Sequence, residues 1–305
     1  MKVRQICMMV LLGLGVIPAM QAQTFDKLWK EVEQAEKKSL PKTVIKLTDE
    51  IYQKGEKERN SAQMLKAYMW RMKTQDILTP DSFYVGLRDL EQWAKQTEQP
   101  MDRAILHSLI AEFYANYAAD NQWQLRQRTE IVGETPSADI REWTANMFVE
   151  KVRTNVKEAL ADSLLLLKTS SLNYIPFVEL GETSEYYHHD MYHLLASRAI
   201  RALNQIERLE RGSFNGITAS PVKQDIINIY ERMTDAYETA GLKEGYVLTM
   251  LQYLEWKRGN DNKLQPVQLK KGLGEWTADT YNAASDELKR QFKSCLLYTS
   301  DAADE

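Results

Sequence analysis

Cysteine is almost absent from this sequence, which has only two cysteines in 305 residues. Two thiols cannot build the disulfide framework of a small secreted domain or a zinc cluster based on thiolates. Glycine and proline are also scarce, at 13 and 8 residues, and this scarcity excludes collagen-like and low-complexity chains. Because 44% of the residues are hydrophobic, the composition also argues against a largely disordered chain.

The sequence has little excess of charge of either sign. Its formal net charge is −4 at pH 7, so no strong basic field draws the protein to nucleic acid or to anionic lipid. A mean hydropathy of −0.49 excludes a protein with many membrane spans. The balance of charge therefore predicts no nucleic-acid partner, and the scarcity of glycine and proline predicts a helical protein.

Residues 1–22 are typical of a secretory signal peptide. Lys2 and Arg4 form a charged start, residues 6–20 are mostly apolar, and Ala22 precedes the expected cleavage point. A transmembrane helix is the alternative, but the apolar stretch is short for a span and is interrupted by glycine and proline. We therefore expect an exported protein of the periplasm or the outer cell envelope.

Residues 295–305, CLLYTSDAADE, match the translation of a transposon end and adapter used in preparing sequencing libraries. We therefore expect these residues to be an artefact and the natural sequence to stop near Lys293 or Ser294, before its true C-terminus. Cys7 lies in the predicted signal peptide and Cys295 in this last stretch. The expected exported part then contains no thiol.

Apolar side chains recur at helical spacing along residues 23–258, which predicts one all-α domain. Proline in the first turn of a helix costs no hydrogen bond, so helices are expected to begin near Pro41, Pro80, Pro100, Pro136 and Pro221. Helix pairs of about 35–45 residues joined by short turns are typical of an irregular, tetratricopeptide-like α-solenoid. A compact helical bundle is the alternative.

Several segments interrupt or follow this pattern. Gly55 and Asn60 predict the turn before the third helix, and Gly241 predicts the turn of a helical hairpin near the end of the domain. Residues 168–187 are apolar but irregular, which indicates a packed connection. Residues 259–275 are polar and rich in glycine, like a linker, and residues 276–294 begin further helical sequence.

The cluster that resembles a metal site contains His188, His189, Asp190 and His193. His189 and His193 are four residues apart, which would place both on one face of a helix, as in a zinc protease. That motif requires glutamate after its first histidine, whereas Asp190 is shorter and no third ligand of standard spacing follows. Because a carboxylate near a helix start is also favoured electrostatically, we interpret the cluster as structural and predict no metal, no cofactor and no catalytic residue.

Four stretches of the sequence resemble a known family. They are TFDKLWKEVEQAEKKSLPKTVIKLTDEIYQKGEKERNSAQMLKAYMWRMK, LTPDSFY, DIREWTANMFVEKV and KTSSLNYIPFVELGETSEYYHHDMYHLLASRAI. They are similar to the N-terminal region of large alpha-2-macroglobulin family proteins of Bacteroidetes. The resemblance extends over residues 24–293.

The resemblance implies a large cell-envelope protein that traps proteases after a bait segment is cut, in many members through a thioester. Neither feature is found in this chain, and the β-sandwich macroglobulin domains are expected downstream. The chain is then a non-catalytic helical module that positions the inhibitor or binds a protein partner, with target proteases contacting the missing region. The alternatives are a free-standing envelope helical-repeat protein that binds peptide or glycan, and a metalloenzyme centred on His189 and His193.

Overall fold

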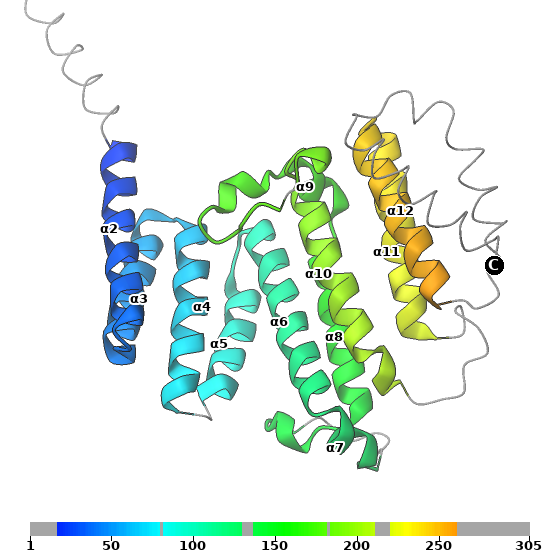
Figure 1. Cartoon of the computed structure of the whole chain (residues 1–305), viewed down its shortest axis with the longest axis horizontal. Coiled ribbons are helices and arrows are strands. Elements are labelled where there is room, and N and C mark those ends of the chain that lie inside the picture. The colour runs from blue at the N-terminus through cyan, green and yellow to red at the C-terminus, as the bar shows by residue number, and fades with distance from the viewer. Residues whose placement is uncertain (1–16, 80–81, 130–136, 182–183, 211–219, 261–305) are drawn as a thin grey trace, which may run out of the picture. The chain divides into compact units, whose positions relative to one another are not determined.

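The structure is a computed structural model that describes residues 17–79, 82–129, 137–181, 184–210 and 220–260 (Figure 1). Within these residues all regular secondary structure is helical, apart from one isolated bridge between Ser170 and Asp190. The prediction of an all-α fold is confirmed for this part of the chain. Two compact units are present: unit 1 contains residues 1–89 and 172–179, and unit 2 contains residues 90–171 and 180–305.

Several sequence predictions concern residues outside the described ranges. These are most of the signal peptide, residues 261–275 of the expected linker, the further helical sequence at 276–294 and the stretch 295–305. Residues 17–22 of the expected signal peptide lie in a helix. None of the described helices has the length and apolar character needed to cross a membrane.

Unit 1 is a set of helices joined by short turns. Its helices are α2 (Ile17–Lys37), α3 (Pro41–Glu58), α4 (Ser61–Leu78) and the first part of α5 (Ser82–Gln96). Helix α3 packs against both α2 and α4 (Figure 1). Since only two residues separate α3 from α4, these two helices run antiparallel.

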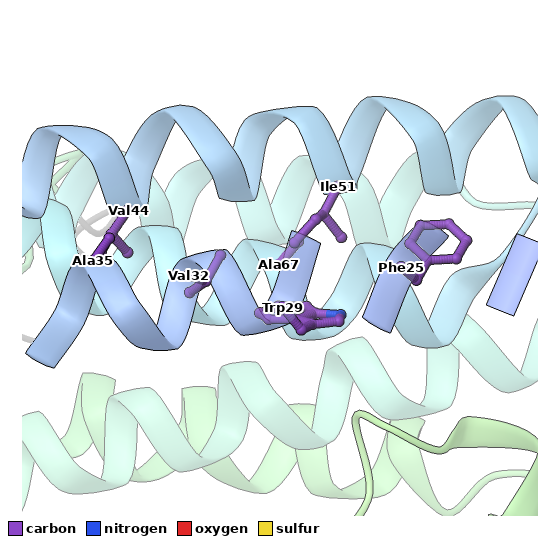
Figure 2. Close-up of a cluster of buried hydrophobic side chains, with 7 residues drawn as sticks. All are labelled: Phe25, Trp29, Val32, Ala35, Val44, Ile51 and Ala67. Carbon is purple, nitrogen blue, oxygen red and sulfur yellow. The ribbon is translucent and has the colours of Figure 1, made fainter. Parts of the chain in front are cut away.

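The core of unit 1 is formed by side chains that recur on one face of each helix. Figure 2 shows them pointing toward one another from α2, α3 and α4: Phe25, Trp29, Val32, Ala35, Val44, Ile51 and Ala67. The indole Nε1 of Trp29 donates a hydrogen bond of 2.6 Å to the buried Oε1 of Gln63. The one polar group that Trp29 brings into this apolar cluster is therefore satisfied.

The prediction that Gly55 belongs to the turn before the third helix is wrong. Gly55 lies within α3 and is buried, and a Cβ placed on it would come within 2.9 Å of Cγ of Met64 in α4. Glycine is present here because the two helices approach closely, which requires the absence of a side chain. The turn itself is formed by Arg59, with a left-handed backbone at φ 54°, and by Asn60.

Replacing Asn60 with alanine is expected to destabilise unit 1 by about 1 kcal/mol. The side chain of Asn60 caps α4, since its Oδ1 accepts a hydrogen bond of 3.1 Å from the N–H of Gln63. Aspartate retains the acceptor, so Asn60→Asp is the matched control and should change stability little. Urea unfolding of both variants measures the difference, and equal losses in both would rule out the capping role.

Unit 2 contains the rest of α5 and a longer series of helices. The α-helices are α6 (Pro100–Asp120), α7 (Gln122–Gln127), α8 (Ala145–Ala159), α9 (Ser163–Lys168), α10 (Met191–Ile206), α11 (Pro221–Thr239) and α12 (Lys243–Asn260). Short 3-10 turns are η1 (Ile140–Glu142), η3 (Ser184–Tyr187) and η4 (Glu207–Leu209), and η2 (Ser171–Tyr174) crosses the unit boundary. Helix α6 packs on α8 and α10, and α11 packs on α10 and α12.

The helix expected from Pro136 begins later than the sequence suggested. Helix α8 starts at Ala145, after the 3-10 turn η1. Local polar contacts favour this turn, since Asp139 accepts a hydrogen bond from the N–H of Arg141 and the indole of Trp143 donates to the carbonyl of Ser137 at 2.7 Å. Side-chain bonds to nearby backbone of this kind compete with helix.

The helical hairpin predicted around Gly241 is confirmed. Helices α11 and α12 flank it, and Gly241 has a φ of 70°, in the left-handed region that favours glycine. Helix α12 continues through residues 259 and 260, which the sequence assigned to a linker. The irregular connection expected at 168–187 is also confirmed in its described residues, which include the short turns η2 and η3.

Candidate functional site

His188 and His189 lie just before α10, and their backbone departs from helical geometry. Both have positive φ, 52° and 53°, which is uncommon for residues other than glycine. The carbonyl of His189 accepts hydrogen bonds from the N–H and the hydroxyl of Ser171, at 2.6 and 2.8 Å. The segment is therefore fixed by its backbone contacts with the preceding connection.

The spacing of His189 and His193 predicted that both lie on one face of a helix, and this prediction is wrong. Helix α10 begins at Met191 and Asp190 is its N-cap, so His189 lies outside the helix. The Oδ1 atom of Asp190 accepts a hydrogen bond of 2.7 Å from the N–H of His193 and one of 3.2 Å from the hydroxyl of Tyr237. Asp190 therefore fixes the start of α10 and ties it to α11.

His193 is packed as an aromatic ring rather than presented to an open site. Its ring stacks on that of Tyr187, with centroids 3.6 Å apart and planes 8° from parallel. Burial lowers the pKa of His193 to about 4, and burial raises the pKa of Asp190 to about 6. Both shifts favour the neutral form of the side chain.

Among the described residues, no group of three or more histidine, cysteine, aspartate or glutamate side chains is arranged to hold a metal ion. Of the three candidate ligands, Asp190 is engaged by Tyr237 and by the start of α10. His193 lies against Tyr187, while the Nδ1 atom of His189 is buried without a hydrogen-bond partner in the described part of the chain. The geometry thus gives this cluster a structural role in connecting α10 with α11.

A hollow on unit 1 was not evident from the sequence. It has a volume of about 630 Å³ and is lined by side chains of α3, α4 and α5. We call it the unit 1 hollow. Tyr68 and Met72 lie at its base, where the hydroxyl of Tyr68 donates a hydrogen bond of 2.6 Å to the carbonyl of Gly86. A Cβ on Gly86 would lie 3.0 Å from Cγ of Met72, so a larger residue at this position would require the Met72 side chain to shift.

The rim of the unit 1 hollow combines exposed apolar and charged side chains. Leu78 and Val85 line it and are 43% and 48% exposed. Arg71 also lines it, pairs with Asp49 at 2.8 Å and lies over the Tyr68 ring at 5.0 Å. A concave surface with apolar walls and a few fixed polar groups is suited to binding an apolar side chain of a partner.

Comparison of the chain with protein-family models, with curated proteins and with solved structures found no match in any of the three.

Proposed function

We propose that this chain is the N-terminal helical, non-catalytic module of a cell-envelope protease inhibitor of the alpha-2-macroglobulin type. The module is exported, acts in the periplasm or at the outer cell envelope, and binds protein. Its partner is either another envelope protein or the macroglobulin domains of the same chain, and these domains trap the target protease. The similarity of residues 24–293 to such proteins supports the family assignment.

The same proposal includes an irregular, tetratricopeptide-like solenoid as the architecture. Consecutive helices joined by short turns, such as α3 with α4 and α11 with α12, support it. Stacked pairs of this kind leave extended surfaces between helices, which such proteins use for binding.

The observation on which the binding role depends is the unit 1 hollow. Leu78 and Val85 expose large apolar side chains beside it. Single exposed apolar residues are ordinary, but two beside one hollow form an apolar surface that a partner can cover. We infer that a partner inserts an apolar side chain over Tyr68 and Met72.

A photo-crosslinking amino acid at position 85, in the full-length protein within its source cells, tests this role. We expect one discrete adduct, because Val85 lines the hollow where the partner binds. The matched control places the same amino acid at Lys73, which is on α4, is exposed and does not line the hollow. Leu78→Asp should abolish the adduct from position 85. Identical adducts from both positions, or an adduct that Leu78→Asp leaves unchanged, would contradict the proposal.

A further inference from the structure

A second hollow lies in unit 2 and is formed by α8, α10 and α11. It has a volume of about 400 Å³, and we call it the unit 2 hollow. Three basic and two acidic side chains line it, which leaves a local charge of +1 (three minus two): Arg153, Lys157, Arg232, Glu150 and Asp225. The distribution of these charges decides what the hollow can bind.

Both acidic side chains are engaged by one arginine. The Nε of Arg153 lies 2.5 Å from Oδ2 of Asp225, and its Nη1 lies 2.9 Å from Oε1 of Glu150. The hydrogen bonds to Asp225 raise the pKa of Arg153, which remains a cation. These three groups therefore satisfy one another and leave the other two cations without a carboxylate from the lining.

Lys157 and Arg232 form no ion pair or hydrogen bond with any other residue that the structure describes. They come from different helices, α8 and α11, and both are exposed at the hollow. Two cations held at the mouth of one concave surface attract an anion, and they are not neutralised by the acidic side chains beside them.

Besides the two cations, the hollow contains a hydrogen-bond donor, the hydroxyl of Tyr192. Its side chain is 2% exposed, it lines the hollow, and its hydroxyl has no hydrogen-bond partner within the described ranges. Burial raises the pKa of Tyr192 to about 12; Arg232 lowers this pKa, whereas Asp190 and Asp235 raise it, so the hydroxyl keeps its proton. The hydroxyl is reachable from the hollow, where a ligand or a water molecule can accept its hydrogen bond.

The lining also has an apolar part. Val156, Leu160 and Ile229 contribute to it and are 5%, 8% and 7% exposed. A ligand that fits must therefore carry an anionic group for Lys157, Arg232 and Tyr192, together with an apolar group for these three side chains. The local charge of +1 matches a monoanion better than a dianionic phosphate.

We propose that the unit 2 hollow is a binding site for an amphipathic monocarboxylate, whose carboxylate lies between Lys157 and Arg232 and accepts the hydrogen bond of Tyr192. The apolar group of the ligand packs on Val156, Leu160 and Ile229. The site belongs to unit 2 and is independent of the partner surface proposed for unit 1. Free short-chain acids and the C-termini of peptides both have this chemistry.

Titration of the whole protein with N-acetyl-leucine, followed by ligand-observed NMR, tests the site. The neutral matched ligand is N-acetyl-leucinamide, which has the same apolar group without the charge. We expect the carboxylate to bind about tenfold more tightly or better, since charge-assisted hydrogen bonds provide at least this discrimination. Equal binding of the two ligands, or binding of neither, would overturn the proposal.

Variants locate the binding in the hollow. Lys157→Gln and Arg232→Gln should each weaken the binding of N-acetyl-leucine by about tenfold, and Tyr192→Phe should weaken it while preserving the packing. Lys243→Gln is the control, because Lys243 is an exposed lysine of unit 2 that does not line the hollow. Unchanged binding in all three hollow variants, or an equal loss in Lys243→Gln, would contradict the assignment.

Two further probes distinguish the sources of the carboxylate. Tighter binding of N-acetyl-Gly-Gly-Leu than of 4-methylpentanoate would support the site and identify peptide C-termini as its ligands. Equal or tighter binding of 4-methylpentanoate would support the site and identify small free acids.

Discussion

Replacing Phe148 with alanine is expected to lower the free energy of unfolding by about 3–5 kcal/mol. Phe148 is 0% exposed, and its ring lies 5.3 Å from that of Trp143 and 5.4 Å from that of Tyr117. These rings connect α6 with α8 and with the segment before α8. The substitution removes buried apolar area and leaves a cavity that the surrounding rings cannot fill. Urea unfolding followed by circular dichroism measures the loss.

Trp123→Ala is the matched control for this prediction. Trp123 also belongs to unit 2 and is a larger aromatic residue, but it is 70% exposed, so its removal should change stability by less than about 0.5 kcal/mol. Phe148→Leu, which keeps most of the volume, should have an intermediate effect and remain folded. If Trp123→Ala destabilises the protein as much as Phe148→Ala, the described packing of α6 and α8 is wrong.

The second large effect concerns the dependence of stability on pH at Asp190 and His193. Burial raises the pKa of Asp190 to about 6, whereas its usual value is 3.8. The protonated carboxyl contributes stability that is fully present below pH 3.8, the pKa of this group in the unfolded chain. This stability is lost as pH rises through about 6. Asp190 therefore lowers stability by about 2 to 3 kcal/mol between pH 3.8 and 7.

His193 acts in the opposite direction over nearly the same range. Burial lowers its pKa to about 4, whereas its usual value is 6.5. The neutral ring contributes stability that is fully present above pH 6.5, its usual pKa, and is lost as pH falls through about 4, by about 3 kcal/mol. In the unsubstituted protein the two contributions offset each other between pH 4 and 6.

Single substitutions should reveal both contributions. Asp190→Asn retains a helix cap but no longer titrates, so its stability relative to the unsubstituted protein should increase as pH rises from 4 to 7. His193→Phe retains a ring against Tyr187, and its relative stability should increase as pH falls over the same interval. Urea unfolding at several pH values measures both differences. Two differences that do not change with pH would show that neither group has a shifted pKa.

Local rules of helix initiation predicted much of the fold. Pro41, Pro100 and Pro221 each stand at the first position of a helix, as expected from proline's fixed φ and missing N–H. A proline at the start of a helix acts on its immediate neighbours only, so its effect can be predicted from the sequence alone. Gly55 shows where they fail, because its small size serves the contact with Met64 in another helix and not a turn.

The candidate sites were harder to predict from the sequence than the helices. The spacing of His189 and His193 indicated a shared helix face, but the cap at Asp190 determines where α10 begins and leaves His189 outside it. The two hollows combine residues from three helices each, and no local pattern brings Lys157 and Arg232 together. Exposed Leu78 and Val85 could not be distinguished from core residues, because apolar periodicity does not show which positions remain uncovered.

Sequencing the source gene across the codon for Lys293 tests the central proposal most directly. The proposal predicts an open reading frame that continues for several hundred residues into β-rich macroglobulin domains. A stop codon within a few dozen residues would contradict the protease-inhibitor module and would favour a free-standing helical protein of the envelope that binds peptide or glycan.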